Sequence, residues 1–223
     1  MGAKQARLTA ASRSVIVFDW DDTLLPTTAI QASSGSVGHY ESHTRECIET
    51  LVAAQAYGEV VIVTAAEDGW VEASCELYMP ELYDMLFGPN ATVLVVSSKA
   101  MFQPFGYHTP GEWKRMAFTA LAERYRTVQG GWNFVSIGDA QHERQALLHA
   151  APIAGNAVPK CVKLSEKPTL EHLSAEIRMV REWFASVMAF SGPLDLKVDG
   201  VSGVEEATAI NCPVEPEAQE VAA

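Results

Sequence analysis

The feature of this chain that most constrains its fold is a regular alternation of short apolar runs with longer stretches of helical pattern. The runs are rich in Val and Ile, as is typical of strands that are buried on both faces of a parallel sheet. Repeated alternation of this kind favours an α/β domain with helices on both faces of its sheet. We therefore predict a doubly wound, mostly parallel sheet of five strands, at residues 15–18, 60–63, 92–96, 133–137 and 161–164.

Helices are predicted between and after these strands. The last of them carries an apolar stripe at three-to-four-residue spacing, from Leu170 to Val187, which is the pattern of a helix with one buried face. The helices are expected at residues 39–57, 69–87, 110–128, 141–150 and 168–190.

The domain organisation follows from where this alternation begins and ends. We assign residues 14–191 to one α/β core and residues 1–13 to a flexible leader. Residues 192–223 are acidic and rich in Gly, Pro, Ala, Glu and Val, which predicts a disordered tail. One short additional strand at residues 194–198 remains an alternative.

Composition narrows the class of partner. The formal net charge of −12 argues against broad binding to nucleic acid or to an anionic membrane, because both need a basic surface. The chain has no apolar run that approaches the ~20 residues needed to span a bilayer. Its four cysteines are scattered, without metal-binding spacing, and are interpreted as core thiols in a reducing compartment, so we expect a cytoplasmic protein.

Two aspartates directly follow the first predicted strand. Asp19 and Asp21 stand in the stretch Asp-Trp-Asp-Asp-Thr after residues 15–18, and the carboxyl ends of strands are where open α/β sheets bind ligands. Clustered carboxylates repel one another unless a cation or a proton compensates them. The usual cation for hard oxygen ligands is Mg²⁺, which also accepts substrate phosphate oxygens. The pattern predicts phosphate chemistry, although a strand-to-helix turn with an Asp N-cap is the plainer interpretation of these residues alone.

Polar residues at later strand ends strengthen the first interpretation. Thr64 ends the second predicted strand, and Gly138 and Asp139 end the fourth. Glu143 follows within the next helix, and Lys114 lies near the start of the helix that leads into the fourth strand. Because parallel strands place their carboxyl ends at one edge of a sheet, we expect these side chains to gather there.

This set of residues, in this order, resembles the haloacid dehalogenase-like superfamily of aspartyl phosphotransferases. The resemblance covers residues 15 to about 190. The family's motifs are a D-x-D-x-T sequence after a strand, a strand ending in Thr or Ser, a lysine before the fourth strand, and Gly-Asp followed by an acid. They are matched here by Asp19, Asp21 and Thr23, by Thr64, by Lys114, and by Gly138, Asp139 and Glu143.

The resemblance implies a Rossmann-like core and a catalytic role for four residues. Asp19 would be the nucleophile that forms an aspartyl-phosphate. Asp21 would be the general acid for the leaving oxygen and then the base for the attacking water. Thr64 would bind phosphoryl oxygens, and Lys114 would neutralise the phosphoryl group. The implied activity is that of a Mg²⁺-dependent phosphatase.

The resemblance also implies a metal site. Asp19, Asp139 and the backbone carbonyl of Asp21 would bind Mg²⁺, and Glu143 would act from behind these ligands. For Glu143, a solvated helix charge that pairs with Arg144 remains the alternative.

Lys99 competes with Lys114 for the contact to phosphate, because it closely follows the third predicted strand. We favour Lys114, since its position on the helix before the fourth strand fits the family better.

The same segments indicate what substrate such a site would accept. Family members often carry a cap domain after the first motif or after the third strand, but residues 24–39 and 99–112 are too few to fold separately. We therefore expect no sizeable cap and an open site for a phosphoprotein or a small phosphate ester. Two alternatives are a non-catalytic binding module of the same fold and a phosphoacceptor domain that resembles a receiver. The oligomeric state is left open.

Overall fold

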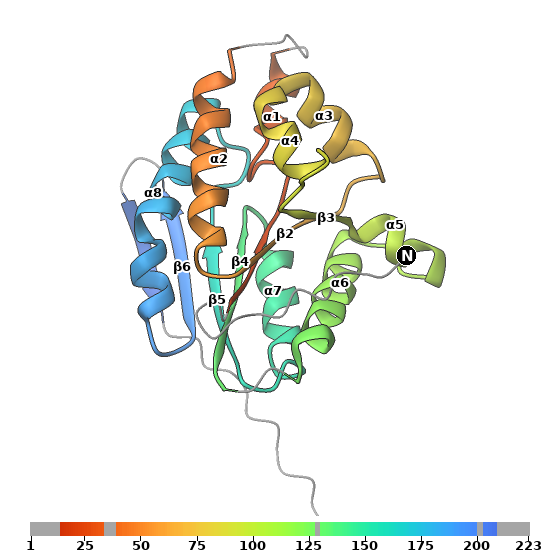
Figure 1. Cartoon of the computed structure of the whole chain (residues 1–223), viewed down its shortest axis with the longest axis vertical. Helices are drawn as coiled ribbons and strands as arrows, with labels where there is room; N and C mark the ends of the chain where they lie inside the picture. The colour runs from red at the N-terminus through yellow and green to blue at the C-terminus, as the bar shows by residue number, and fades with distance from the viewer. Residues whose placement is uncertain (1–13, 34–38, 128–129, 200–202, 209–223) are drawn as a thin grey trace, which may run out of the picture.

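The described residues form a sheet of seven strands that runs through the centre of the molecule, in the order β3-β2-β1-β4-β5-β6-β7 (Figure 1). Neighbouring strands from β3 to β6 are parallel, and β7 is antiparallel to β6. The computed structural model describes residues 14–33, 39–127, 130–199 and 203–208. The strands are β1 (Ser14–Phe18), β2 (Glu59–Thr64), β3 (Leu94–Ser97), β4 (Trp132–Gly138), β5 (Ala157–Lys163), β6 (Leu194–Asp199) and β7 (Gly203–Thr208).

Helices cover both faces of this sheet. The α-helices are α1 (Thr27–Ala32), α2 (Glu41–Gln55), α3 (Trp70–Tyr78), α4 (Tyr83–Leu86), α5 (Ser98–Phe102), α6 (Pro110–Tyr125), α7 (Gln141–Ala150) and α8 (Leu170–Ala189), with 3-10 turns η1 (Pro80–Leu82) and η2 (Gln103–Phe105). Helices α2 and α8 lie against one face, and α6 and α7 against the other (Figure 1). Of the helices formed by the described residues, none combines the length and the apolar composition that crossing a bilayer requires.

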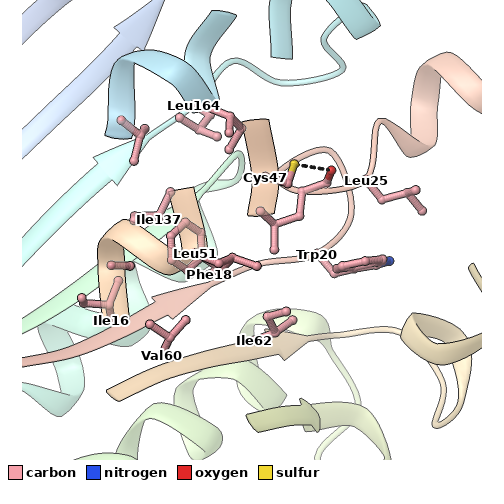
Figure 2. Close-up of a cluster of buried hydrophobic side chains, with 14 of the residues drawn as sticks. Ile16, Phe18, Trp20, Leu25, Cys47, Leu51, Val60, Ile62, Ile137 and Leu164 are labelled. Atoms are coloured by element: carbon pink, nitrogen blue, oxygen red, sulfur yellow. Dashed lines mark hydrogen bonds between the residues drawn. The ribbon is translucent and has the colours of Figure 1, made fainter. Parts of the chain in front are cut away.

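The core forms two layers because successive residues of a strand point to opposite faces of the sheet. Ile16 and Phe18 of β1 belong to the layer under α2 and α8, whereas Val15 and Val17 belong to the layer under α6 and α7. All four side chains are at most 1% exposed. Figure 2 shows the first layer, in which the residues of β1 and β2 meet Leu51 of α2. Because β1 is packed on both faces, the position of its carboxyl end is fixed.

The predicted fold class is confirmed in its main lines, but the strand count is wrong. The structure is a doubly wound α/β sheet, mostly parallel, with seven strands instead of five. The order of its first six strands, 3-2-1-4-5-6, is that of a Rossmann-like sheet. Between β1 and α2 the described residues form only α1, and between β3 and α6 only α5 and η2, so neither segment shows a cap domain there.

The predicted domain boundary at residue 191 is also wrong, because β6 belongs to the sheet. It pairs in parallel with β5, and its Leu196 and Val198 are buried against the core. The alternation of apolar and polar residues in Leu-Asp-Leu-Lys-Val suits a strand with one buried face. Such a strand lacks the long apolar runs from which the other strands were predicted. Residues 1–13 and 209–223, assigned to the leader and to the end of the tail, lie outside the described residues.

One predicted helix is interrupted. The segment 69–87 forms α3, η1 and α4 in succession, and the break falls at Pro80. Proline lacks the N–H that continues a helix and disfavours a helical conformation at the preceding residue. The break lets the segment fold back on the side of the molecule that lies above β2 and β3 in the view of Figure 1.

We expect a chain truncated after Ser191 to lose stability. The truncation removes β6, exposes the edge of β5 and deletes two buried side chains, Leu196 and Val198. At roughly 1.5–3 kcal/mol for each buried aliphatic side chain, the free energy of unfolding should fall by about 3–6 kcal/mol. Urea unfolding measures the change. A chain that ends at Thr208 retains β6 and β7 and is the matched control; equal unfolding midpoints for the two truncations would show that β6 adds nothing to the core.

Candidate catalytic and metal site

The candidate site lies where the chain reverses the order in which it adds strands to the sheet. From β1 the chain continues to β2 on one side, while β4 lies on the other side of β1 and is followed by β5. At such a switch point the carboxyl ends of the strands leave a crevice in which α/β proteins bind ligands. Asp19 directly follows β1, and its N–H donates to the carbonyl of Ile137 in β4, 2.9 Å away. Asp139 directly follows β4.

Three carboxylates meet at this crevice. Asp19, Asp139 and Glu143 each present an oxygen, and these oxygens all lie within 4.8 Å of one another. Asp19 and Glu143 are buried, and Asp139 is partly buried. All three donors are hard oxygen atoms, as Mg²⁺, Ca²⁺ and Mn²⁺ prefer. This cluster can therefore hold a metal ion.

A buried lysine lies between two members of the cluster. Nζ of Lys114 is 2.7 Å from Oδ1 of Asp19, and it also pairs with Glu143. The Lys114 side chain is 1% exposed. It reaches the site from the second turn of α6, which begins with a capping box between Thr109 and Glu112.

Glycine at position 138 allows Glu143 to approach the cluster. A Cβ at Gly138 would lie 2.6 Å from Cγ of Glu143, which is closer than real contacts allow. Glu143 lies in the first turn of α7 and accepts the N–H of Ala140 at 3.0 Å. Nε2 of His142 lies 2.8 Å from its other oxygen, which also pairs with Lys114. Both oxygens of Glu143 therefore have protein partners.

The electrostatics of the cluster favour an added cation. Burial raises the pKa of Asp19 to about 7, because Lys114 only partly offsets burial and Glu143 adds repulsion. Burial, and then Glu143, raise the pKa of Asp139 to about 7. Burial alone would raise the pKa of Glu143, but Lys114 and His142 outweigh burial and lower this pKa to about 2. When all three carboxylates are ionised, the single ammonium of Lys114 leaves two negative charges, which a divalent cation would balance.

Lys114 itself stays charged in this setting. Burial acts to lower its pKa, but the carboxylates of Asp19 and Glu143 outweigh burial and raise it. The ammonium is thus a permanent positive charge beside the Asp19 carboxylate.

Asp21 lies outside the three-carboxylate group and has its own partners. Its Oδ1 accepts hydrogen bonds from Oγ1 of Thr27 at 2.7 Å and from Nε1 of Trp70 at 2.9 Å. Oγ1 of Thr64 lies 3.4 Å from Oδ2. The structure therefore places Thr64 beside Asp21, at the same edge as Asp19. A metal contact through the Asp21 carbonyl stays a prediction.

Lys99, the competing lysine, points elsewhere. It belongs to α5 and pairs with the exposed Glu67. Its Nζ lies 5.5 Å from the ring centroid of Trp113. Lys114 is accordingly the lysine that contacts Asp19, while its role toward phosphate stays a prediction.

Sequence reasoning missed three residues that support this edge. Thr27 and Trp70 bond to Asp21, and Lys163 at the end of β5 donates to the carbonyl of Asp139 at 2.7 Å. Lys163 could have been found as a polar residue that ends a fifth parallel strand. Thr27 lies only six residues after Asp21 in a segment with no clear pattern. Trp70 carries no comparable signal because its contact spans 49 residues.

Three of the four cysteines are core thiols, as the sequence predicted. Cys47, Cys75 and Cys161 are free and buried, and Cys212 lies outside the described residues. The thiol of Cys47 donates to the carbonyl of Leu24 in the loop after the aspartates (Figure 2).

Comparisons with models of protein families, with curated proteins and with solved structures found no match. The geometry of the site therefore carries the functional argument.

Proposed function

We propose that this protein is a Mg²⁺-dependent phosphatase of the haloacid dehalogenase-like type, which hydrolyses a phosphate monoester through an aspartyl-phosphate on Asp19. The observation that carries the proposal is the surroundings of Asp19. This buried carboxylate directly follows β1 at the switch point of the sheet, contacts the ammonium of Lys114, and shares with Asp139 and Glu143 a cluster that could hold a metal ion. A carboxylate held in this way is suited to nucleophilic attack on phosphorus.

In the first step, an Asp19 oxygen attacks phosphorus in line with the leaving oxygen. The bond between phosphorus and the leaving oxygen breaks as the bond to Asp19 forms. Asp21 donates its proton to the leaving oxygen, so that an alcohol departs instead of an alkoxide. The N–H and hydroxyl at Thr64 would donate to the phosphoryl oxygens.

In the second step, Asp21 accepts a proton from water, which attacks phosphorus and releases Asp19. Lys114 compensates the charge of Asp19 and of the phosphoryl group in both steps. Bound Mg²⁺ would supply charge neutralisation between the carboxylates and the phosphate. Asp19 and Asp139 would hold it, while Glu143 keeps Lys114 and the α7 N-terminus in place.

The substrate we propose is a phosphoprotein or a small phosphate ester. The short segments that precede α2 and α6 contain no domain among their described residues that would close over the site. An open site of this kind accommodates a phosphate on a large carrier as well as on a small one.

Release of inorganic phosphate from p-nitrophenyl phosphate, with Mg²⁺ and with EDTA, tests the proposal. A phosphatase releases phosphate continuously in Mg²⁺ only. A phosphoacceptor domain would instead retain phosphate after one turnover, and a binding module would release none. Either of these results would overturn the proposed function.

We expect Asp139→Ala to weaken Mg²⁺ binding more than Glu143→Gln does. Among the described residues, no lysine pairs with the Asp139 carboxylate as Lys114 pairs with Glu143, so Asp139 is available to bind the metal directly. Loss of a residue that acts behind the ligands typically costs ~10–100-fold in affinity, and loss of the direct ligand should exceed that. Isothermal titration calorimetry measures both dissociation constants, and a weaker binding in Glu143→Gln would reverse the assignment.

A further inference from the structure

Helix α3 is joined to the loop of the two aspartates by a reciprocal pair of indole hydrogen bonds. Nε1 of Trp20, the residue between the aspartates, donates to Oγ of Ser74 at 3.0 Å. In the opposite direction, Nε1 of Trp70 donates to Oδ1 of Asp21 at 2.9 Å. Oγ of Ser74 in turn donates to the Trp70 carbonyl at 2.6 Å. The first two turns of α3 and the aspartate loop therefore hold each other in position.

The turn before α3 directs the indole of Trp70 toward the aspartate loop. Gly69 has a φ of 80°, a left-handed conformation that glycine adopts without strain. Trp70 follows it directly as the first residue of α3. The indole is partly buried and returns toward β1 instead of pointing to solvent.

The donors around Asp21 distinguish its two carboxyl oxygens. Oδ1 accepts two short hydrogen bonds, from Thr27 and from Trp70. Within the described part of the chain, Oδ2 has only the longer 3.4 Å contact to Thr64. A carboxyl oxygen offers two lone-pair positions, so Oδ1 is filled. A proton on this carboxyl group is therefore favoured on Oδ2, where it can be passed on without breaking either short bond.

We propose that Trp70 is a positioning residue that orients Asp21 for proton transfer, and that it thereby determines how basic a leaving group the enzyme can expel. This inference rests on the proposed phosphatase function. Proton donation matters most when the leaving oxygen is strongly basic, because such an oxygen departs poorly as an anion. Loss of the indole N–H should consequently slow the hydrolysis of phosphate esters of basic alcohols and phenols more than that of other esters.

The test compares Trp70→Phe with the wild-type protein on phenyl phosphate and p-nitrophenyl phosphate. These substrates are similar in shape, but phenolate is far more basic than p-nitrophenolate. The kcat/KM value reports the steps up to the first phosphoryl transfer. General acid catalysis contributes about 10²–10⁴-fold, so partial loss of orientation should lower kcat/KM for phenyl phosphate ~10-fold and change the value for p-nitrophenyl phosphate less than ~3-fold. Asp21→Asn should show the same selectivity in stronger form.

Trp113→Phe is the matched control. Its indole N–H donates to the Tyr107 carbonyl at 2.8 Å, so the same chemical change is made without touching Asp21, and the ratio of the two kcat/KM values should not change. Thr27→Val removes the other donor to Oδ1 and should reproduce the selectivity, which provides a second variant if Trp70→Phe does not fold. Calorimetry should give a Mg²⁺ dissociation constant for Trp70→Phe within about twofold of wild type, because the indole does not contact the three-carboxylate group.

The outcomes separate this inference from the proposed function. If wild type hydrolyses both esters in Mg²⁺ and Trp70→Phe and Thr27→Val slow them equally or not at all, the positioning role is wrong and the phosphatase function stands. If wild type releases no phosphate in a Mg²⁺-dependent manner, the function fails and the inference fails with it.

Discussion

Asp19→Asn should reduce phosphatase turnover by at least about three orders of magnitude, while the protein remains folded. An amide oxygen is a far weaker nucleophile than a carboxylate, so the aspartyl-phosphate cannot form at a useful rate. Asparagine has nearly the same shape, and its carbonyl can still accept a hydrogen bond from Lys114. It also removes a charge that burial disfavours, since burial raises the pKa of Asp19 to about 7.

Initial rates with p-nitrophenyl phosphate at saturating Mg²⁺ measure this effect, and thermal unfolding of the same samples verifies the fold. Glu67→Gln is a suitable control, because it removes an exposed acid whose partner is Lys99 instead of the cluster. Near-wild-type turnover in a folded, metal-saturated Asp19→Asn protein would show that another group attacks the phosphate.

The position of the site could be predicted from sequence because it depends on topology more than on packing. Val15–Phe18 and the run before Gly138 both read as buried parallel strands, and parallel strands place their carboxyl ends together. Asp19 and Asp139 could therefore be expected at the same edge of the sheet, wherever the helices between them lay. The structure places them in one cluster at the switch point of the sheet.

The contacts of Asp21 could not be predicted in the same way. The indole of Trp70 reaches Asp21 because the chain turns at Gly69 directly before α3. Such a contact depends on the path of a loop, for which periodicity gives no signal. Strand β6 was predicted only as an alternative to a disordered tail, for a different reason. A strand with one buried face alternates apolar and polar residues and resembles the polar tail that follows it.

The second large effect is expected for Lys114→Met, in both turnover and stability. Lys114 is almost fully buried between Asp19 and Glu143, and its removal leaves both carboxylates without their positive partner. Breaking a buried ion pair by removing one member typically costs about 3–5 kcal/mol. In catalysis, the same change removes the charge that compensates the phosphoryl group, for which we expect a loss of about 10²–10³-fold in kcat, as for other electrostatic donors.

Lys99→Met is the matched control, because it makes the same chemical change at Lys99, the other lysine that follows the third strand. Its ion pair with Glu67 is largely exposed, so the free energy of unfolding should change by no more than about 1 kcal/mol. Urea unfolding in EDTA measures the stability of both variants, and initial rates in Mg²⁺ measure their turnover. Because Mg²⁺ would supply positive charge to the same carboxylates, the metal should recover part of the lost stability in Lys114→Met but not its turnover, since the ammonium beside Asp19 is still missing. Equal turnover in the two variants would separate Lys114 from the chemistry and leave it as a structural counter-ion.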